Sequence, residues 1–197
     1  MPRIRNVAIL IFPDVELLDF CGPFEVFSVA NRQTDDAAFN IYCAAETLAP
    51  ITTRNGLSVV PHFTLVDGPQ PDLLLVPGGI GTRKEITNTS LIQWLERTAQ
   101  HCELIVSVCT GALLLGKAGL LHGLATTTHH VAFDLLQEIV PTATVHRDRR
   151  YVDNGRVITS AGIAAGIDMS LHIVARLLGP NIALATAKHM EYPWEHP

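Results

Sequence analysis

Residues 103–119 constrain the fold of this 197-residue chain more than any other stretch. Within it, Leu104–Val108 is a short, apolar run rich in β-branched residues, which is typical of a buried strand in a parallel sheet. Residues 111–118 are rich in alanine and leucine, and they predict a short helix that ends before Gly119. Almost nothing connects the two elements. We therefore predict a sharp strand-to-helix turn, a nucleophile elbow, with Cys109 at its corner in a strained backbone conformation.

Cys109 is the best nucleophile candidate in the chain. Its small neighbours Ser107, Gly111 and Ala112 leave room for the turn. The first free N–H groups of the following helix would lie beside the sulfur, so we expect the thiolate to be favoured. A buried cysteine is more commonly an unreactive small hydrophobic residue. The corner position favours the nucleophile over that alternative.

Strands and helices alternate along the sequence. This order predicts an α/β fold with a doubly wound, mostly parallel sheet and helices on both faces, whose ligands bind at the carboxyl ends of the strands. Caps are expected at Ser90 and Asn181. The tail 192–197 is expected to be non-helical. The expected strands are 7–12, 39–45, 72–76, 104–108 and 125–128, with a minor strand at 57–60 and a connection at 63–66. The expected helices are 17–31, 90–101, 111–118, 131–140, 167–178 and 181–190. Residues 144–152 are expected to pair with residues 156–160 in a hairpin.

Length and composition favour one domain over residues 1–197. Apolar residues make up 48% of the chain and charged residues 17%, which suits a fully buried sheet. The net charge of −5 argues against a nucleic-acid partner. No apolar run approaches the ~20 residues of a membrane span. The apolar run near the N-terminus, which ends at Pro13, is too short for the apolar region and cleavage site of a signal peptide.

The cysteines and histidines give no pattern of their own. Cys21, Cys43, Cys102 and Cys109 are irregularly spaced and form neither a Cys-x-x-Cys motif nor a disulfide framework, so we expect a reducing cytoplasm. The nine histidines lack the spacing typical of a zinc site, and we expect neither a metal nor a cofactor.

Gly78 and Gly79 follow the predicted strand 72–76, so their N–H groups can face the same crevice as the elbow. Glycines let a ligand approach the backbone closely. With the N–H of Thr110, these groups would form an oxyanion-type hole. An ordinary tight turn explains the pair of glycines equally well.

Two further side chains are candidates for the site. Asp19 lies in an otherwise apolar segment, where a carboxylate is costly unless it is paired or protonated. It could cap a helix that resumes at Pro23, or it could face Cys109 with a raised pKa and share one proton with the sulfur. His129 and His130 follow a predicted strand, and at most one of them can face the site. A hydrogen-bonded core histidine is an equally good interpretation.

Together these segments resemble the ThiJ/PfpI superfamily, which has a class I glutamine amidotransferase-like fold. The chain is most similar to the isonitrile hydratase branch and to the amidase-like domain of AraC-type regulators. Protease-like members carry a histidine directly after the nucleophile, where this chain has Thr110, and this difference favours the hydratase branch. The resemblance rests on Asp19-x-x-Gly22-Pro23, Pro77-Gly78-Gly79, the run from Ser107 to Ala112, and Thr127-Thr128-His129.

The resemblance implies a flavodoxin-like fold and a homodimer. It also implies a nucleophilic Cys109, an acid/base Asp19, a polar partner Thr110 and a backbone donor Gly79; Gly78 and His129 are expected to contact substrate. The activity that follows is hydration of isonitriles to N-substituted formamides through a thioimidate on Cys109. The alternatives are glyoxalase-like hydration of α-oxoaldehydes, a non-catalytic ligand or redox sensor, and a regulatory domain acting through a partner protein. The chain ends at Pro197, so we expect no DNA-binding domain.

Overall fold

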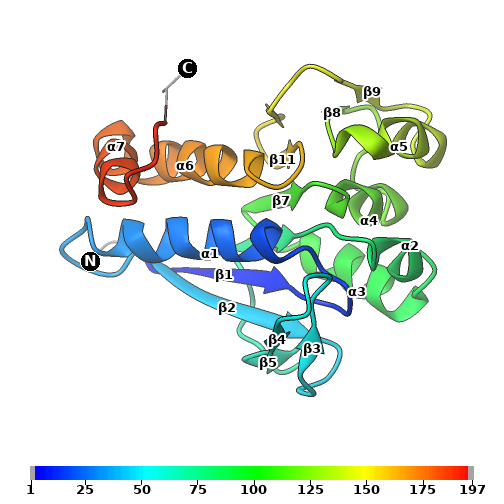
Figure 1. Cartoon of the computed structure of the whole chain (residues 1–197), viewed down its shortest axis with the longest axis horizontal. Coiled ribbons are helices and arrows are strands. Elements are labelled where there is room, and N and C mark those ends of the chain that lie inside the picture. Colours follow the sequence, from blue (N-terminus) through cyan, green and yellow to red (C-terminus); the bar gives the residue numbers. More distant parts are fainter. Residues whose placement is uncertain (1–2, 195–197) are drawn as a thin grey trace.

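The computed structural model describes residues 3–194, and its centre is one seven-stranded sheet in the order β10-β11-β7-β6-β1-β2-β5 (Figure 1). All neighbouring strands are parallel except β10 and β11. This confirms the predicted flavodoxin-like, mostly parallel sheet. The strands are β1 Arg5–Leu10, β2 Phe39–Ala45, β5 Phe63–Thr64, β6 Leu73–Val76, β7 Leu104–Val108, β10 Tyr151–Asp153 and β11 Val157–Ser160.

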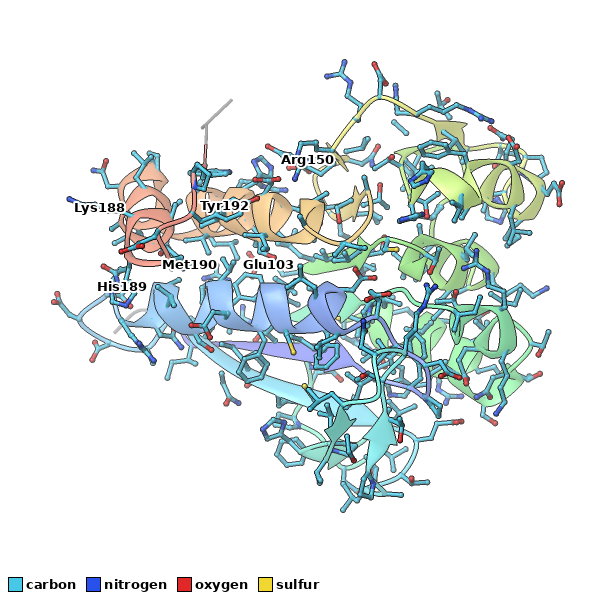
Figure 2. The ribbon with its side chains drawn as sticks, in the orientation of Figure 1. Glu103, Arg150, Lys188, His189, Met190 and Tyr192 are labelled. Carbon is cyan, nitrogen blue, oxygen red and sulfur yellow. The ribbon has the colours of Figure 1, made fainter. Side chains whose placement is uncertain are left out.

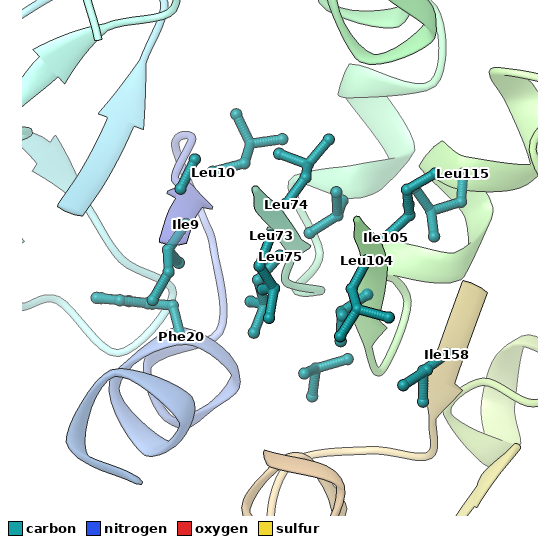
Figure 3. Close-up of a cluster of buried hydrophobic side chains, with 14 of the residues drawn as sticks. Ile9, Leu10, Phe20, Leu73, Leu74, Leu75, Leu104, Ile105, Leu115 and Ile158 are labelled. Atoms are coloured by element: carbon teal, nitrogen blue, oxygen red, sulfur yellow. The ribbon is translucent and has the colours of Figure 1, made fainter. Parts of the chain in front are cut away.

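Helices cover both faces of the sheet, as predicted. On one face, α1 packs against α6 and α7, and on the other α4 packs against α2, α3 and α5 (Figures 1 and 3). No helix within residues 3–194 is long and apolar enough to cross a membrane. The helices are α1 Leu17–Asn31, α2 Thr82–Glu85, α3 Thr89–Ala99, α4 Gly111–Lys117, α5 Phe133–Ile139, α6 Ala165–Leu178 and α7 Pro180–His189, with a 3-10 turn, η1, at His130–Ala132.

The core lies on both sides of the sheet, around strands β11, β7, β6 and β1. In β6, three consecutive side chains are almost completely buried: Leu73, Leu74 and Leu75. Because side chains alternate between the two faces of a sheet, this strand packs against the helices on both faces. Figure 3 shows the three leucines between Ile9 of β1 and Ile105 of β7. Strands buried on both faces explain why these segments are apolar throughout rather than alternating.

Several expectations about local structure were wrong. Residues 144–152 do not form one strand: β9 (Thr144–Val145) pairs with β8 (Ala125–Thr126) in a separate small sheet, and only β10 forms the hairpin with β11. The helix expected to begin at Ser90 is instead capped by Asn88, whose side chain accepts a hydrogen bond from the N–H of Leu91 at 3.2 Å. The last helix begins at Pro180, not after a cap at Asn181, because proline suits the first helical position.

Short elements were missed because their periodicity is too brief to detect. These are α2 and β3 (Ile51–Thr52), which forms a hairpin with β4 (Ser58–Val59). β4 lies within the predicted minor strand 57–60, whereas the predicted connection 63–66 instead contains the edge strand β5. Residues 192–194 are non-helical as predicted, and residues 195–197 of that tail lie outside the described part of the chain.

The elbow between β7 and α4 has the predicted strain. Cys109 adopts φ of 56°, a left-handed conformation that non-glycine residues rarely take. Two residues later, a Cβ atom on Gly111 would lie 2.0 Å from the carbonyl oxygen of Val76 on the neighbouring strand. Only glycine lets the chain pass β6 this closely and enter the helix at once.

We therefore predict that Gly111→Ala destabilises the protein by about 3 kcal/mol or more, because the methyl group overlaps backbone that cannot move freely. Gly155→Ala is a suitable control: Gly155 has φ of +84° but open space around its Cβ position. That control should cost only about 1 kcal/mol, the strain of the backbone alone. Urea unfolding measures both, and equal losses would contradict the steric account of the elbow.

Candidate active site

Two segments, residues 160–161 and the one that contains Thr128, fix the backbone of Cys109. Its N–H donates to the carbonyl oxygens of Ser160 (3.1 Å) and Ala161 (3.2 Å), and its own carbonyl accepts a hydrogen bond from Oγ1 of Thr128 at 2.7 Å. The side chain is only 5% exposed. These contacts hold the residue in its strained conformation and aim the sulfur at the carboxyl end of the sheet.

Asp19 lies in the first turn of α1 and is completely buried. Because α1 begins at Leu17 and continues through Pro23, Asp19 does not cap a helix that resumes at Pro23. One oxygen, Oδ2, accepts the N–H of Gly78 at 3.0 Å. The other, Oδ1, is buried and has no hydrogen-bond partner of standard geometry within residues 3–194.

Burial dominates the titration of Asp19. It raises the pKa of this carboxyl to about 7, although hydrogen bonds from the Cys109 side chain and the Gly78 N–H act in the opposite direction. The carboxyl is therefore poised to gain or lose a proton near neutral pH.

The expectation of a favoured thiolate was wrong. Burial, together with the charge of Asp19, raises the pKa of Cys109 to about 12, and the N–H of Thr110 at the helix start only partly offsets these two effects. Desolvation beside a carboxylate outweighs the helix amide here because the sulfur has almost no contact with solvent. Near neutral pH, Asp19 and Cys109 form a pair in which the sulfur keeps its proton.

Gly78 and Gly79 support the acid and the elbow, and their N–H groups are not free for a ligand. The N–H of Gly78 binds Asp19, and the N–H of Gly79 donates to Oγ1 of Thr110 at 3.0 Å, so the oxyanion-type hole expected from these two amides is not formed. Thr110 returns the contact by donating to the carbonyl of Gly79 at 3.1 Å. A Cβ on Gly78 would lie 2.9 Å from Oδ2 of Asp19 and 2.5 Å from the N atom of Thr110, so only glycine fits between them.

A cavity of about 220 Å³ opens at Cys109. This volume admits a small molecule and is below the range usual for drug-sized ligands. It brings together the predicted residues Cys109, Thr110, Gly79 and His129, whereas Asp19 and Gly78 are not among its lining residues. The remaining lining residues, which the sequence reasoning missed, are Glu16, Arg54, Ile80, Arg83, Val131 and Ile163.

His129 is the histidine that faces this cavity. Its Nδ1 accepts the N–H of Val131 at 3.4 Å, and a Cβ on Gly162 would lie 2.1 Å from its Cδ2 atom, so the ring rests directly on the backbone of Gly162. Burial, together with the nearby His130 and Arg83, lowers its pKa and so favours the neutral ring. No group of three potential metal ligands occurs within residues 3–194.

Comparison with known proteins places the chain in a family. Residues 5–176 match the model of the DJ-1/PfpI family. The chain belongs to this family. It is 33% identical to isonitrile hydratase of Pseudomonas putida over 95% of this chain and 78% of that protein. It is also 31% identical to the HTH-type transcriptional regulator CdhR of Pseudomonas aeruginosa, of which it spans about half (91% of this chain, 52% of CdhR).

Solved structures of this DJ-1/PfpI family agree with the fold. A ThiJ/PfpI family protein from Pseudomonas syringae superposes with a TM-score of 0.87 at 30% identity, covering 100% of this chain and 78% of that one. DJ-1beta of Drosophila melanogaster has a TM-score of 0.83 at 19% identity over 98% and 100% of the two chains, which shows a shared fold. The relatives of this chain thus include an isonitrile hydratase and a transcriptional regulator.

Burial of Asp19 has a measurable cost in stability. Its folded pKa exceeds the unfolded value of 3.8, so the folded state binds more protons between about pH 4 and pH 7 and loses stability as the pH rises through that window. We predict that Asp19→Asn, which stays neutral, raises the free energy of unfolding at pH 8 by roughly 2–4 kcal/mol. The gain should shrink as the pH falls toward 4.

Chemical denaturation at several pH values measures this effect. Asp36→Asn, at an exposed position, is the matched control and should leave the free energy of unfolding almost unchanged at every pH. A destabilised Asp19→Asn at pH 8 would contradict the assignment of a strained, desolvated carboxylate.

Proposed function

We propose that the protein hydrates isonitriles to N-substituted formamides, with Cys109 as the nucleophile and Asp19 as general acid and base. One observation carries this proposal: a completely buried carboxyl with a pKa of about 7 interacts with a cysteine thiol held on a strained elbow. The similarity to isonitrile hydratase over most of both chains supports the same reaction.

The first step needs a nucleophile and a proton at the same carbon. The terminal carbon of R–N≡C must gain a proton as the sulfur adds. The pair of Asp19 and Cys109 holds that one proton on the thiol. Ionised Asp19 takes the proton from the Cys109 thiol while the sulfur bonds to the carbon, and it then delivers that proton to the same carbon. The product is the thioimidate R–N=CH–S–Cys109, and Asp19 is again ionised.

The second step consumes one water molecule. Asp19 accepts a proton from the water as the water oxygen bonds to the carbon, and it passes that same proton to the nitrogen. The product is the tetrahedral adduct R–NH–CH(OH)–S–Cys109, and Asp19 is again ionised. Collapse of this adduct breaks the C–S bond, returns a proton to the sulfur and releases R–NH–CHO. The sum is one isonitrile and one water giving one formamide, with the pair regenerated.

A raised thiol pKa distinguishes this proposal from a redox sensor. Cysteines that oxidise readily are accessible and have low pKa values. Cys109 is 5% exposed, and its pKa is raised, so the resting site protects the sulfur from oxidants. Hydration requires no free thiolate, because Asp19 removes the proton during attack.

Two alternative roles share the same residues. Glyoxalase-like hydration of α-oxoaldehydes would use the same pair, and the similarity to CdhR and to an AraC family regulator of Pseudomonas putida favours ligand sensing without turnover. The homodimer and the cytoplasmic location remain predictions.

Substitution of the pair tests the hydratase directly. Cys109→Ala should abolish formamide production, and Asp19→Asn should lower kcat by about 10²–10⁴-fold, the usual contribution of general acid–base catalysis. In the wild type, kcat/KM should rise with pH through about 7, because protonated Asp19 cannot accept the thiol proton. This rise should be absent from any residual activity of Asp19→Asn.

Formamide release from a panel of aliphatic and aromatic isonitriles is the measurement. Cys102→Ala is the matched control, since Cys102 is buried before β7 at the opposite end of that strand from the elbow. Full activity in Asp19→Asn would exclude the proposed mechanism. Lactate formation from methylglyoxal without isonitrile turnover would support the glyoxalase alternative, and ligand binding without either product would support a sensor.

A further inference from the structure

A second cavity, of about 360 Å³, lies beside the one at Cys109. The two cavities share His129 and Ile163 as lining residues. The second cavity also contains Phe133 and two arginines, Arg147 and Arg149. A substrate bound at Cys109 therefore has a neighbouring space in which a substituent can lie.

The charged groups around the two cavities are strongly unbalanced. Among the described residues that line the two cavities, Glu16 alone is acidic, and it pairs with Arg54 at 3.8 Å. In the second cavity, Arg147 pairs with Asp134 and stacks over Phe133, with its Cζ atom 5.3 Å from the ring centroid. Two other arginines that line the cavities form no ion pair with a carboxylate of the described residues.

Arg83 and Arg149 are these two arginines. Arg83 lines the first cavity, and its only side-chain hydrogen bond within residues 3–194 is to Oγ1 of Thr82 at 3.1 Å. Arg149 lines the second cavity and is exposed, with no carboxylate partner within the described residues. Its neighbour Arg150 lies beside α6 and pairs with Asp168 instead (Figure 2). On a chain of net charge −5, this positive region is local to the mouth of the site.

We propose that the natural substrate of this site carries a carboxylate on its N-substituent, which binds Arg83 in the cavity at Cys109 or extends past His129 to bind Arg149 in the second cavity. The inference rests on the proposed function and specifies its substrate class. Guanidinium groups match carboxylates in shape and charge, and a rim without free acids would repel a cationic substituent.

Chain length decides which arginine is used. A short substituent keeps its carboxylate in the cavity at Cys109, near Arg83, whereas a longer one reaches the second cavity and Arg149. A series of ω-isocyano carboxylates of increasing length, each compared with its neutral primary amide, separates the two cases.

The quantity to measure is the ratio of kcat/KM for each carboxylate to that for its amide. In the wild type we expect a ratio of about 10 or more, the size of one charge-assisted hydrogen bond, and a decrease as salt is added. Arg83→Gln should lower the ratio most for short substrates and Arg149→Gln for long ones. Arg97→Gln, which removes an exposed arginine of α3 outside both cavities, should not change it.

Calorimetric binding of the products keeps this inference separate from the proposed function. N-formyl amino acids should bind more tightly than their amides, and the double variant Arg83→Gln/Arg149→Gln should lose that difference. A carboxylate-to-amide ratio at or below 1 in the wild type, or one unchanged in the double variant, would overturn the inference even if isonitriles are hydrated. If no isonitrile is hydrated, the proposed function fails, and equal binding of N-formyl acids and amides would overturn the anion preference as well.

Discussion

The burial of one carboxyl group against one thiol is the interaction on which the rest of the site depends. Asp19 has no exposed surface, so its charge is destabilised and its pKa moves to about 7. Cys109 beside it keeps its proton for the same reason. Once Asp19 is ionised, the pair holds a single proton, which lies on the sulfur beside a carboxylate that can accept it.

The fold supplies this arrangement by bringing loops together at one end of the sheet. The loop after β1 and the loop after β6 are tied by the N–H of Glu16, which donates to the carbonyl of Gly78 at 2.9 Å. Gly78 in turn binds Asp19, and Gly79 binds Thr110 of the elbow. The glycines are required because the loops approach too closely for a Cβ atom, so the parallel sheet, the strained elbow and the buried acid form one structural unit.

Much of this could be predicted from sequence. The apolar strands and the junction of Leu104–Val108 with the next helix identified both the sheet and the elbow, and a lone acid among leucines indicated Asp19. The expected thiolate was wrong because the prediction considered the helix amide, which lowers the pKa of Cys109, and left out desolvation, which raises it. Desolvation depends on packing that no local sequence pattern reveals. Arg83 and Ile163 were missed because neither stands in a motif. Only the folded chain brings them to the cavity at Cys109.

The state of the pair can be observed directly by infrared spectroscopy. The S–H stretch of Cys109, identified by its loss in Cys109→Ala, should persist up to at least pH 9 and change frequency near pH 7 as Asp19 ionises beside it. The frequency change should be absent in Asp19→Asn. Loss of the Cys109 S–H band by pH 7, or a band that does not respond to Asp19, would contradict the coupled, protonated pair on which the proposed chemistry rests.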